Sequence, residues 1–141
     1  MKHRLPILEA DVLATCLDWL AMKHILHFRI NSGAVQGEYK GKSRYVPFVR
    51  TFIPGVGYVE KGMTDICALV KCQKTFAPVG TLQTWLADVP KFMAIEVKRL
   101  GKESTAEQVR FHEAVRAAGH VAVEVHSLDE LVKAMAGEGV R

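Results

Sequence analysis

The chain has 141 residues, of which 49% are hydrophobic and 24% are charged. This length and balance are typical of one soluble globular domain, and they exclude a largely disordered chain. No apolar run approaches the roughly 20 residues that a membrane-spanning helix needs. We therefore expect a single domain over residues 1–141 that makes no contact with a membrane.

The formal net charge is +4, which suits a polyanionic partner such as DNA but is not specific for one. The odd number of cysteines, three, argues against a disulfide framework. Glu9 and Asp11 interrupt the apolar N-terminal stretch too early for the core of a signal peptide. These features predict a cytoplasmic protein.

The first expected element is an amphipathic helix over residues 6–23. Leu13, Leu17 and Leu20 recur at spacings of four and three, which is the period of a buried helical stripe. Continued backward by four residues, the stripe reaches Glu9. A carboxylate aligned with a buried stripe at the start of a helix is a candidate functional group.

Apolar runs after this helix predict strands at residues 25–30, 46–53, 57–59, 65–70, 92–97 and 121–125. The turn signal at 31–33 opens a polar, basic segment through Arg44 that we expect to be a loop. Residues 71–90 are less regular, and we interpret them as an excursion with one helical turn.

Two further helices are predicted from capping signals. Ser104 followed by Glu107 has the form of a capping box, and the helix it opens is expected to end near Gly119. Ser127 begins a second helix that reaches about Ala136, followed by a frayed tail at 137–141. The fold class is therefore α/β, with a mixed central sheet flanked by helices.

Three side chains are the principal catalytic candidates. Glu96 and Lys98 are two residues apart, so they project from the same face of a strand, and Asp65 begins another apolar strand. If the two strands are neighbours, the carboxylates converge, and oxygen ligands of this kind suit Mg²⁺ or Mn²⁺. Such a metal and a lysine are what phosphodiester hydrolysis needs.

A non-functional interpretation is also open. The E-x-K pattern is common by chance, and an exposed Glu–Lys pair contributes under about 1 kcal/mol. Gln108 favours the functional interpretation, because it shares one side of its helix with Phe111 and His112. A helix entered a few residues after the E-x-K strand returns Gln108 toward the end of that strand.

Basic residues supply candidate contacts to DNA. They are Arg29, Lys40, Lys42, Arg44, Arg99 and Lys102, together with the neutral Asn31. The segment 40–50 interleaves its basic residues with aromatic ones, which is typical of nucleic-acid-binding loops. A solvated basic loop without a partner is the competing interpretation.

Several motifs together resemble one nuclease family. They are GMTDI at 62–66, IEVKR at 95–99, GKES at 101–104 with Gln108 and Phe111, and Ala118-Gly119 before the final strand and helix. In this order they resemble the virus-type replication-repair nuclease (VRR-NUC) family of the PD-(D/E)xK superfamily, and FRINSG at 28–33 adds to the likeness. Thr64 departs from the proline or serine often found there, and the long spacing from Asp65 to Glu96 suggests an insertion at 71–90.

The resemblance implies a restriction-endonuclease-like core and a role for each matched residue. Asp65, Glu96 and the Val97 carbonyl would bind the metal, with Glu9 helping to hold it or its waters. Lys98 would be the catalytic lysine. Gln108 would support the site from its helix.

The resemblance also implies a Mg²⁺- or Mn²⁺-dependent DNA endonuclease that forms a homodimer and is selective for branched DNA, like a Holliday-junction resolvase. A two-fold axis would match the related strands of a four-way junction. A phage or mobile-element setting and a role in DNA repair fit the family. The alternatives are a general endonuclease without branch preference and a non-catalytic DNA-binding module on the same fold.

Overall fold

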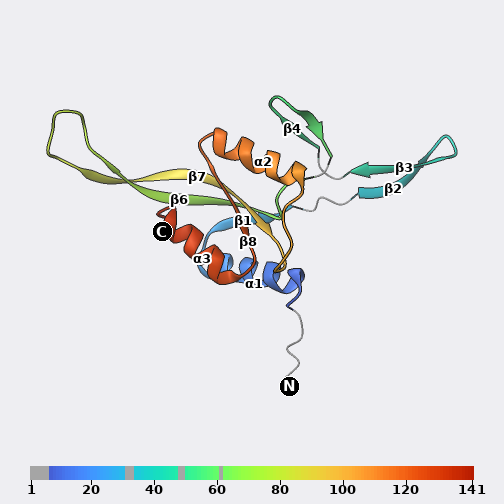
Figure 1. Ribbon diagram of the computed structural model, residues 1–141, viewed down its shortest axis with the longest axis horizontal. Helices are drawn as coiled ribbons and strands as arrows, with labels where there is room; N and C mark the ends of the chain where they lie inside the picture. The colour runs from blue at the N-terminus through green and yellow to red at the C-terminus, as the bar shows by residue number, and fades with distance from the viewer. Residues whose placement is uncertain (1–6, 31–33, 48–49, 61) are drawn as a thin grey trace, which may run out of the picture.

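The computed structural model describes residues 7–30, 34–47, 50–60 and 62–141 (Figure 1). Its central sheet has the strand order β1-β6-β7-β8. These strands are β1 (Leu26–Arg29), β6 (Ile66–Phe76), β7 (Trp85–Val97) and β8 (Val121–Val125). β1, β6 and β7 pair antiparallel, whereas β8 is parallel to β7. The expected α/β class with a mixed sheet is confirmed.

Helices cover both faces of this sheet. The helices are α1 (Glu9–Met22), α2 (Ala106–Ala117) and α3 (Leu128–Gly137). α1 and α3 pack on one face and α2 on the other, as Figure 1 shows. Because side chains alternate along a strand, Ile95 and Val97 face α1 and α3, while Ala94 and Glu96 face α2. None of the helices among the described residues is long and apolar enough to cross a membrane.

The helices lie where the sequence predicts them, with small shifts. α1 buries Val12, Cys16 and Leu20, so Leu20 of the predicted stripe is confirmed, whereas Leu13 and Leu17 are only partly buried beside Val12 and Cys16. α3 is capped by Ser127, as predicted. The predicted cap of α2 is wrong by one residue, because Thr105 is its N-cap and Gln108, not Glu107, completes the capping box.

The predicted loop through Arg44 is wrong. β2 (Ala34–Tyr39) and β3 (Lys42–Pro47) form an antiparallel hairpin, which projects from one end of the molecule in Figure 1. Lys40 and Gly41 form its turn with φ values of 51° and 69°, the left-handed geometry that matches strand twist in a two-residue hairpin. The predicted strand at 46–53 is also divided, since β3 ends at Pro47 and β4 (Thr51–Ile53) pairs with β5 (Gly57–Val59).

The predicted irregular excursion at 71–90 is also wrong. β6 continues to Phe76 and β7 begins at Trp85, with residue pairing kept as far as Phe76 opposite Trp85. Pro90 is tolerated within β7 because, among the described strands, that part of β7 has a neighbour on one side only. Residues 74–87, here called the long arm, extend away from the body (Figure 1).

The C-terminal tail is bound rather than frayed, which corrects the prediction for 137–141. Gln73 N donates to the Gly139 carbonyl at 2.8 Å, and Arg141 N donates to the Lys71 carbonyl at 3.2 Å. The Arg141 guanidinium forms an ion pair with Asp88 at 2.9 Å. The tail thereby occupies the edge of β6 beyond the end of β1, where backbone groups would otherwise lack strand partners.

Candidate active site

The sheet register places Asp65 opposite Glu96. Ile66 and Ile95 are partners in the antiparallel β6–β7 pair. The preceding residue of β6, Asp65, therefore lies opposite the next residue of β7, Glu96, and both side chains project from the same face of the sheet. Asp65 Oδ2 accepts a hydrogen bond from the Val97 N–H at 2.8 Å. The two carboxylates predicted from separate strands are therefore brought together at one end of the sheet.

Glu96 is the centre of a hydrogen-bonded cluster on the α2 face. Its side chain is fully buried, and Oε1 accepts hydrogen bonds from Lys98 Nζ and from Gln108 Nε2. Its other oxygen, Oε2, is buried without a hydrogen-bond partner among the described residues. A buried carboxylate oxygen is costly to leave unsatisfied. This oxygen and the neighbouring Asp65 carboxylate fit the ligand set of a divalent cation.

The charges of the cluster perturb one another. Burial raises the pKa of Glu96 to about 7, and the nearby Asp65 and Glu9 charges also raise it, while the hydrogen bond from Lys98 acts against them. Burial likewise raises the pKa of Asp65 despite the bond from Val97. Burial and mutual repulsion disfavour the ionised form of both carboxyls, and a cation between them would stabilise that form.

Lys98 keeps its charge in this setting. Burial lowers the pKa of its ammonium, but the hydrogen bond and the charge of Glu96 outweigh burial, so that the pKa is raised overall. Glu9 and Asp65 act in the same direction. The site therefore presents a fixed, half-buried cation beside two carboxylates.

Two further predicted residues flank the carboxylates. Glu9 lies in the first turn of α1, and its Oε2 accepts a hydrogen bond from the Arg99 N–H at 3.3 Å. Arg29 is exposed at the end of β1, close enough for its charge to lower the pKa of Asp65. Asn31 lies outside the described residues.

Gln108 stands where the sequence predicts it, at the strand end. It is the third residue of α2, and its Oε1 accepts from the Thr105 N–H at 2.9 Å while its Nε2 donates to Glu96. The same amide therefore caps the helix and orients the Glu96 carboxylate.

We expect Gln108→Ala to lower the rate of any reaction at this site by about tenfold or more, because Glu96 loses the partner that fixes its orientation. Thr105→Ala is the matched control, since it removes the cap at a cost of about 1 kcal/mol but leaves the Glu96 partner in place. Turnover and urea unfolding of both variants would be measured. Equal losses of turnover in the two variants would assign Gln108 a capping role only.

Gly62 sets the distance between this turn and α2. Its φ is +82°, and a Cβ at this position would lie 2.2 Å from Glu107 Cβ and 2.9 Å from the backbone nitrogen of Gln108. The glycine of the GMTD motif is thus needed for close approach to the first turn of α2.

Gly62→Ala is expected to destabilise the protein by about 3 kcal/mol, through both a strained φ and a backbone clash. Gly55→Ala is the matched control, because Gly55 has a φ of +79° but nothing within 4 Å of the added Cβ. Its expected loss is about 1 kcal/mol. Urea unfolding checks the difference, and equal losses would mean that the contact with α2 contributes nothing.

Sequence reasoning missed a third carboxylate on this face, after Asp65 and Glu96. Glu124 of β8 is the strand partner of Glu96, and its Oε2 accepts from the Ser104 N–H at 2.9 Å and from the Ser104 hydroxyl. Its position in the alternating run VAVEV, parallel to IEV of β7, is the signal that could have revealed it. Ser104, predicted to be a helix cap, instead fixes the segment that leads into α2.

His112 is also part of this face. Its ring is 4% exposed, and its Nε2 is buried without a hydrogen-bond partner among the described residues. Burial lowers the pKa of His112 to about 4, and the nearby Arg116 charge acts in the same direction. The ring is therefore neutral at pH 7.

The candidate DNA-contacting residues divide into two groups. Arg99 and Lys102 follow β7, and the Arg99 N–H donates to the Glu9 carboxylate. Lys40 and Lys42 lie at the tip of the β2–β3 hairpin, with Arg44 further along β3. The structure does not bring this second group to the site, because the hairpin points away from it (Figure 1).

Within the described part of the chain, no group of three or more His, Cys, Asp and Glu side chains lies close enough to hold a metal ion. The candidate set thus needs the Val97 carbonyl or waters in addition to its two carboxylates. Comparisons of the chain with protein families, with curated proteins and with solved structures give no match. Its function is therefore inferred from the residues of this site and their arrangement.

Proposed function

We propose that this protein is a metal-dependent DNA endonuclease with a PD-(D/E)xK core of the VRR-NUC type. The observation that carries the proposal is the buried Glu96 carboxylate, whose Oε1 accepts from Lys98 and Gln108 and whose Oε2 has no hydrogen-bond partner in the part of the chain that the structure describes. A purely structural Glu–Lys pair belongs at the surface, where desolvation costs nothing.

The residues present fit Mg²⁺ or Mn²⁺. Asp65 and Glu96 would provide carboxylate oxygens, the Val97 carbonyl would be a further ligand, and Glu9 would hold waters of the ion. When bound, such an ion polarises a phosphate oxygen and lowers the pKa of a water molecule.

The chain's own residues would act on the scissile phosphate. Lys98 Nζ, held by Glu96 Oε1, would stabilise the negative charge that gathers on the phosphate oxygens as the attacking water adds. Gln108 would keep the Glu96 carboxylate in one orientation by donating to Oε1, so that Oε2 is left to bind the metal ion. Arg29 and Arg99, on either side, would position the DNA backbone.

Branched DNA is the proposed substrate class. Lys40 and Lys42 at the tip of the β2–β3 hairpin, which points away from the site (Figure 1), would contact a part of the DNA beyond the cleaved strand. A general endonuclease would share the same site. A non-catalytic module is disfavoured, because it would have no reason to keep a carboxylate, a lysine and an amide hydrogen-bonded at the cost of burial.

The test is incubation with labelled four-way junction, flap, duplex and single-stranded DNA in Mg²⁺, in Mn²⁺ and in chelator. We expect nicking that requires the divalent ion and is fastest on a branched substrate. Equal rates on branched and plain duplex DNA would favour the general endonuclease. No cleavage of any substrate in either metal would refute the nuclease.

A homodimer is also proposed, with the long arm as its contact. Val79 and Leu82 at the tip are fully exposed, and Trp85 stacks on Phe76 with ring centroids 6.1 Å apart. A two-stranded ribbon with exposed apolar side chains is marginally stable in water by itself. A second copy of the chain, paired through a two-fold axis, would cover it.

We expect the double substitution Leu82→Ser and Trp85→Ser to weaken dimerisation by at least about tenfold, since aromatic anchors dominate interface energies. Analytical ultracentrifugation over a concentration series measures the dissociation constant. Val56→Ser, in the exposed turn between β4 and β5, is the control. A wild-type protein that stays monomeric at high concentration would contradict the proposal.

A further inference from the structure

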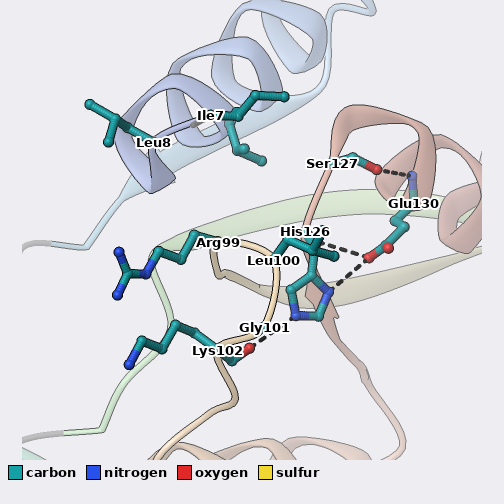
Figure 2. Close-up of a pocket in the computed structure, with 10 residues that line it drawn as sticks. Ile7, Leu8, Arg99, Leu100, Gly101, Lys102, His126, Ser127 and Glu130 are labelled. Atoms are coloured by element: carbon teal, nitrogen blue, oxygen red, sulfur yellow. Dashed lines mark hydrogen bonds and ion pairs between the residues drawn. The ribbon is translucent and has the colours of Figure 1, made fainter. Parts of the chain in front are cut away.

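A cavity of about 810 Å³ lies beyond the end of β7, between the residues that precede α1 and the start of α3 (Figure 2). One wall is the start of α1, with Ile7 and Leu8, and the opposite wall is the segment after β7, with Leu100 and Lys102. The apolar side chains here are unusually exposed, at 73% for Ile7 and 88% for Leu100. Large apolar side chains gathered around a hollow mark a binding surface.

The rim of this cavity is cationic. Figure 2 shows the side chains of Arg99 and Lys102 projecting to the same side of it. The acidic residue at the cavity, Glu130, is engaged by His126, with Oε2 at 3.1 Å from Nδ1. A ligand that suits this cavity therefore combines an apolar part with a negative charge.

His126 also holds the cavity wall in place. Its Nε2 is 3.1 Å from the Lys102 carbonyl, and its Nδ1 is bonded to the Glu130 carboxylate. Both partners are acceptors, so both ring nitrogens must donate, which requires the imidazolium form. The segment between β7 and α2, which forms this wall, is therefore held at two points. His126 bonds to the Lys102 carbonyl, and Glu9 accepts from the Arg99 N–H.

The cavity and the carboxylate cluster share this wall. Arg99 follows Lys98 directly, so their Cα atoms are about 3.8 Å apart. Glu9 connects the cavity with the cluster, because it accepts a hydrogen bond from the Arg99 N–H and its charge raises the pKa of Glu96. A DNA strand whose phosphate lies at Lys98 would place its adjoining nucleotide at the mouth of the cavity.

We infer that this cavity receives one unpaired nucleotide next to the scissile phosphate, its base between Leu100 and the start of α1 and its phosphate at Arg99 and Lys102. The inference rests on the proposed nuclease function for the position of the strand. A base inside a duplex is stacked and cannot enter, whereas a nucleotide at a flap or branch point can. The cavity thus selects substrates with an unpaired nucleotide at the cleavage site.

The test uses Leu100→Gln, with Met22→Gln as the matched control, because both side chains are exposed and Met22 lies at the far end of α1. The probe is a flap DNA with 2-aminopurine at the first unpaired nucleotide, compared with a fully paired duplex in chelator, where no cleavage occurs. Thermal unfolding and sedimentation of each variant are recorded in parallel.

The wild type and Met22→Gln are expected to change the 2-aminopurine emission and to prefer flap over duplex DNA. Leu100→Gln is expected to reduce that preference about tenfold, on the order of one lost apolar contact with the base, with its duplex affinity kept. Equal preference in all three proteins would overturn the inference, as would loss of a dimer in Leu100→Gln, which would make a second copy the occupant.

Cleavage of the same flap in Mg²⁺ or Mn²⁺ separates the two proposals. Binding and emission changes without cleavage would refute the nuclease and leave the nucleotide cavity standing. Cleavage with an unchanged flap preference in Leu100→Gln would refute the cavity and leave the nuclease.

Discussion

Lys98→Ala is expected to lower metal-dependent DNA cleavage by at least about 10²-fold, because one group that stabilises developing phosphate charge is lost. The ammonium is held by Glu96 and is partly buried, with 13% of its side chain exposed. We therefore expect that a cation from solution does not take the place of the Lys98 ammonium in the variant. The effect should fall on the rate of the chemical step, with DNA affinity changed much less.

Single-turnover cleavage with saturating protein isolates that step. Lys133→Ala, which removes an exposed lysine from α3, is the control for the loss of one positive charge from the protein. If Lys98→Ala and the control cleave at the wild-type rate, the assignment of Lys98 as the catalytic lysine is wrong.

Glu96→Gln is expected to abolish cleavage and yet to stabilise the metal-free protein above neutral pH. The folded state raises the pKa of this carboxyl from 4.5 to about 7, so between these values the folded protein binds more protons than the unfolded chain. The free energy of unfolding then falls as pH rises through this window, and the loss is complete above about pH 7. Glutamine carries no charge and escapes the loss.

Urea unfolding in chelator at pH 5 and pH 8.5 measures the effect. We expect Glu96→Gln to be more stable than the wild type by roughly 3 kcal/mol at pH 8.5, because raising the pKa from 4.5 to about 7 costs about 1.4 kcal/mol for each pKa unit, and by under about 1 kcal/mol at pH 5. Glu113→Gln, on the exposed side of α2, should show neither change. A variant that is less stable than the wild type at both pH values would refute the buried-carboxylate account.

The cluster around Glu96 was predictable because its members follow simple periodicities. Glu96 and Lys98 share a strand face at a spacing of two, and Gln108 lies one turn into a helix that follows directly. Asp65 was predicted to begin a strand, and the antiparallel pairing of β6 with β7 placed it opposite Glu96.

The two hairpins were not predictable in the same way. Residues 74–86 of the long arm are exposed, as are residues 36, 38 and 40–43 of the β2–β3 hairpin, so that no buried face imposes a pattern on these residues. The turn at Lys40-Gly41 lacks the usual asparagine or aspartate before glycine. Glu124 was missed because only the parallel pairing of β8 with β7, a long-range contact, brings it beside Glu96.

The most direct test of the central claim is Mn²⁺ binding, measured by calorimetry and by the electron spin resonance of the free ion, without DNA. The wild type should bind Mn²⁺ at pH 8, and both Asp65→Asn and Glu96→Gln should lose that binding, because each removes one carboxylate from a shared ion. Asp18→Asn, an exposed residue of α1, should bind as the wild type does. Undiminished Mn²⁺ binding in either site variant would contradict a cation shared by the two strands.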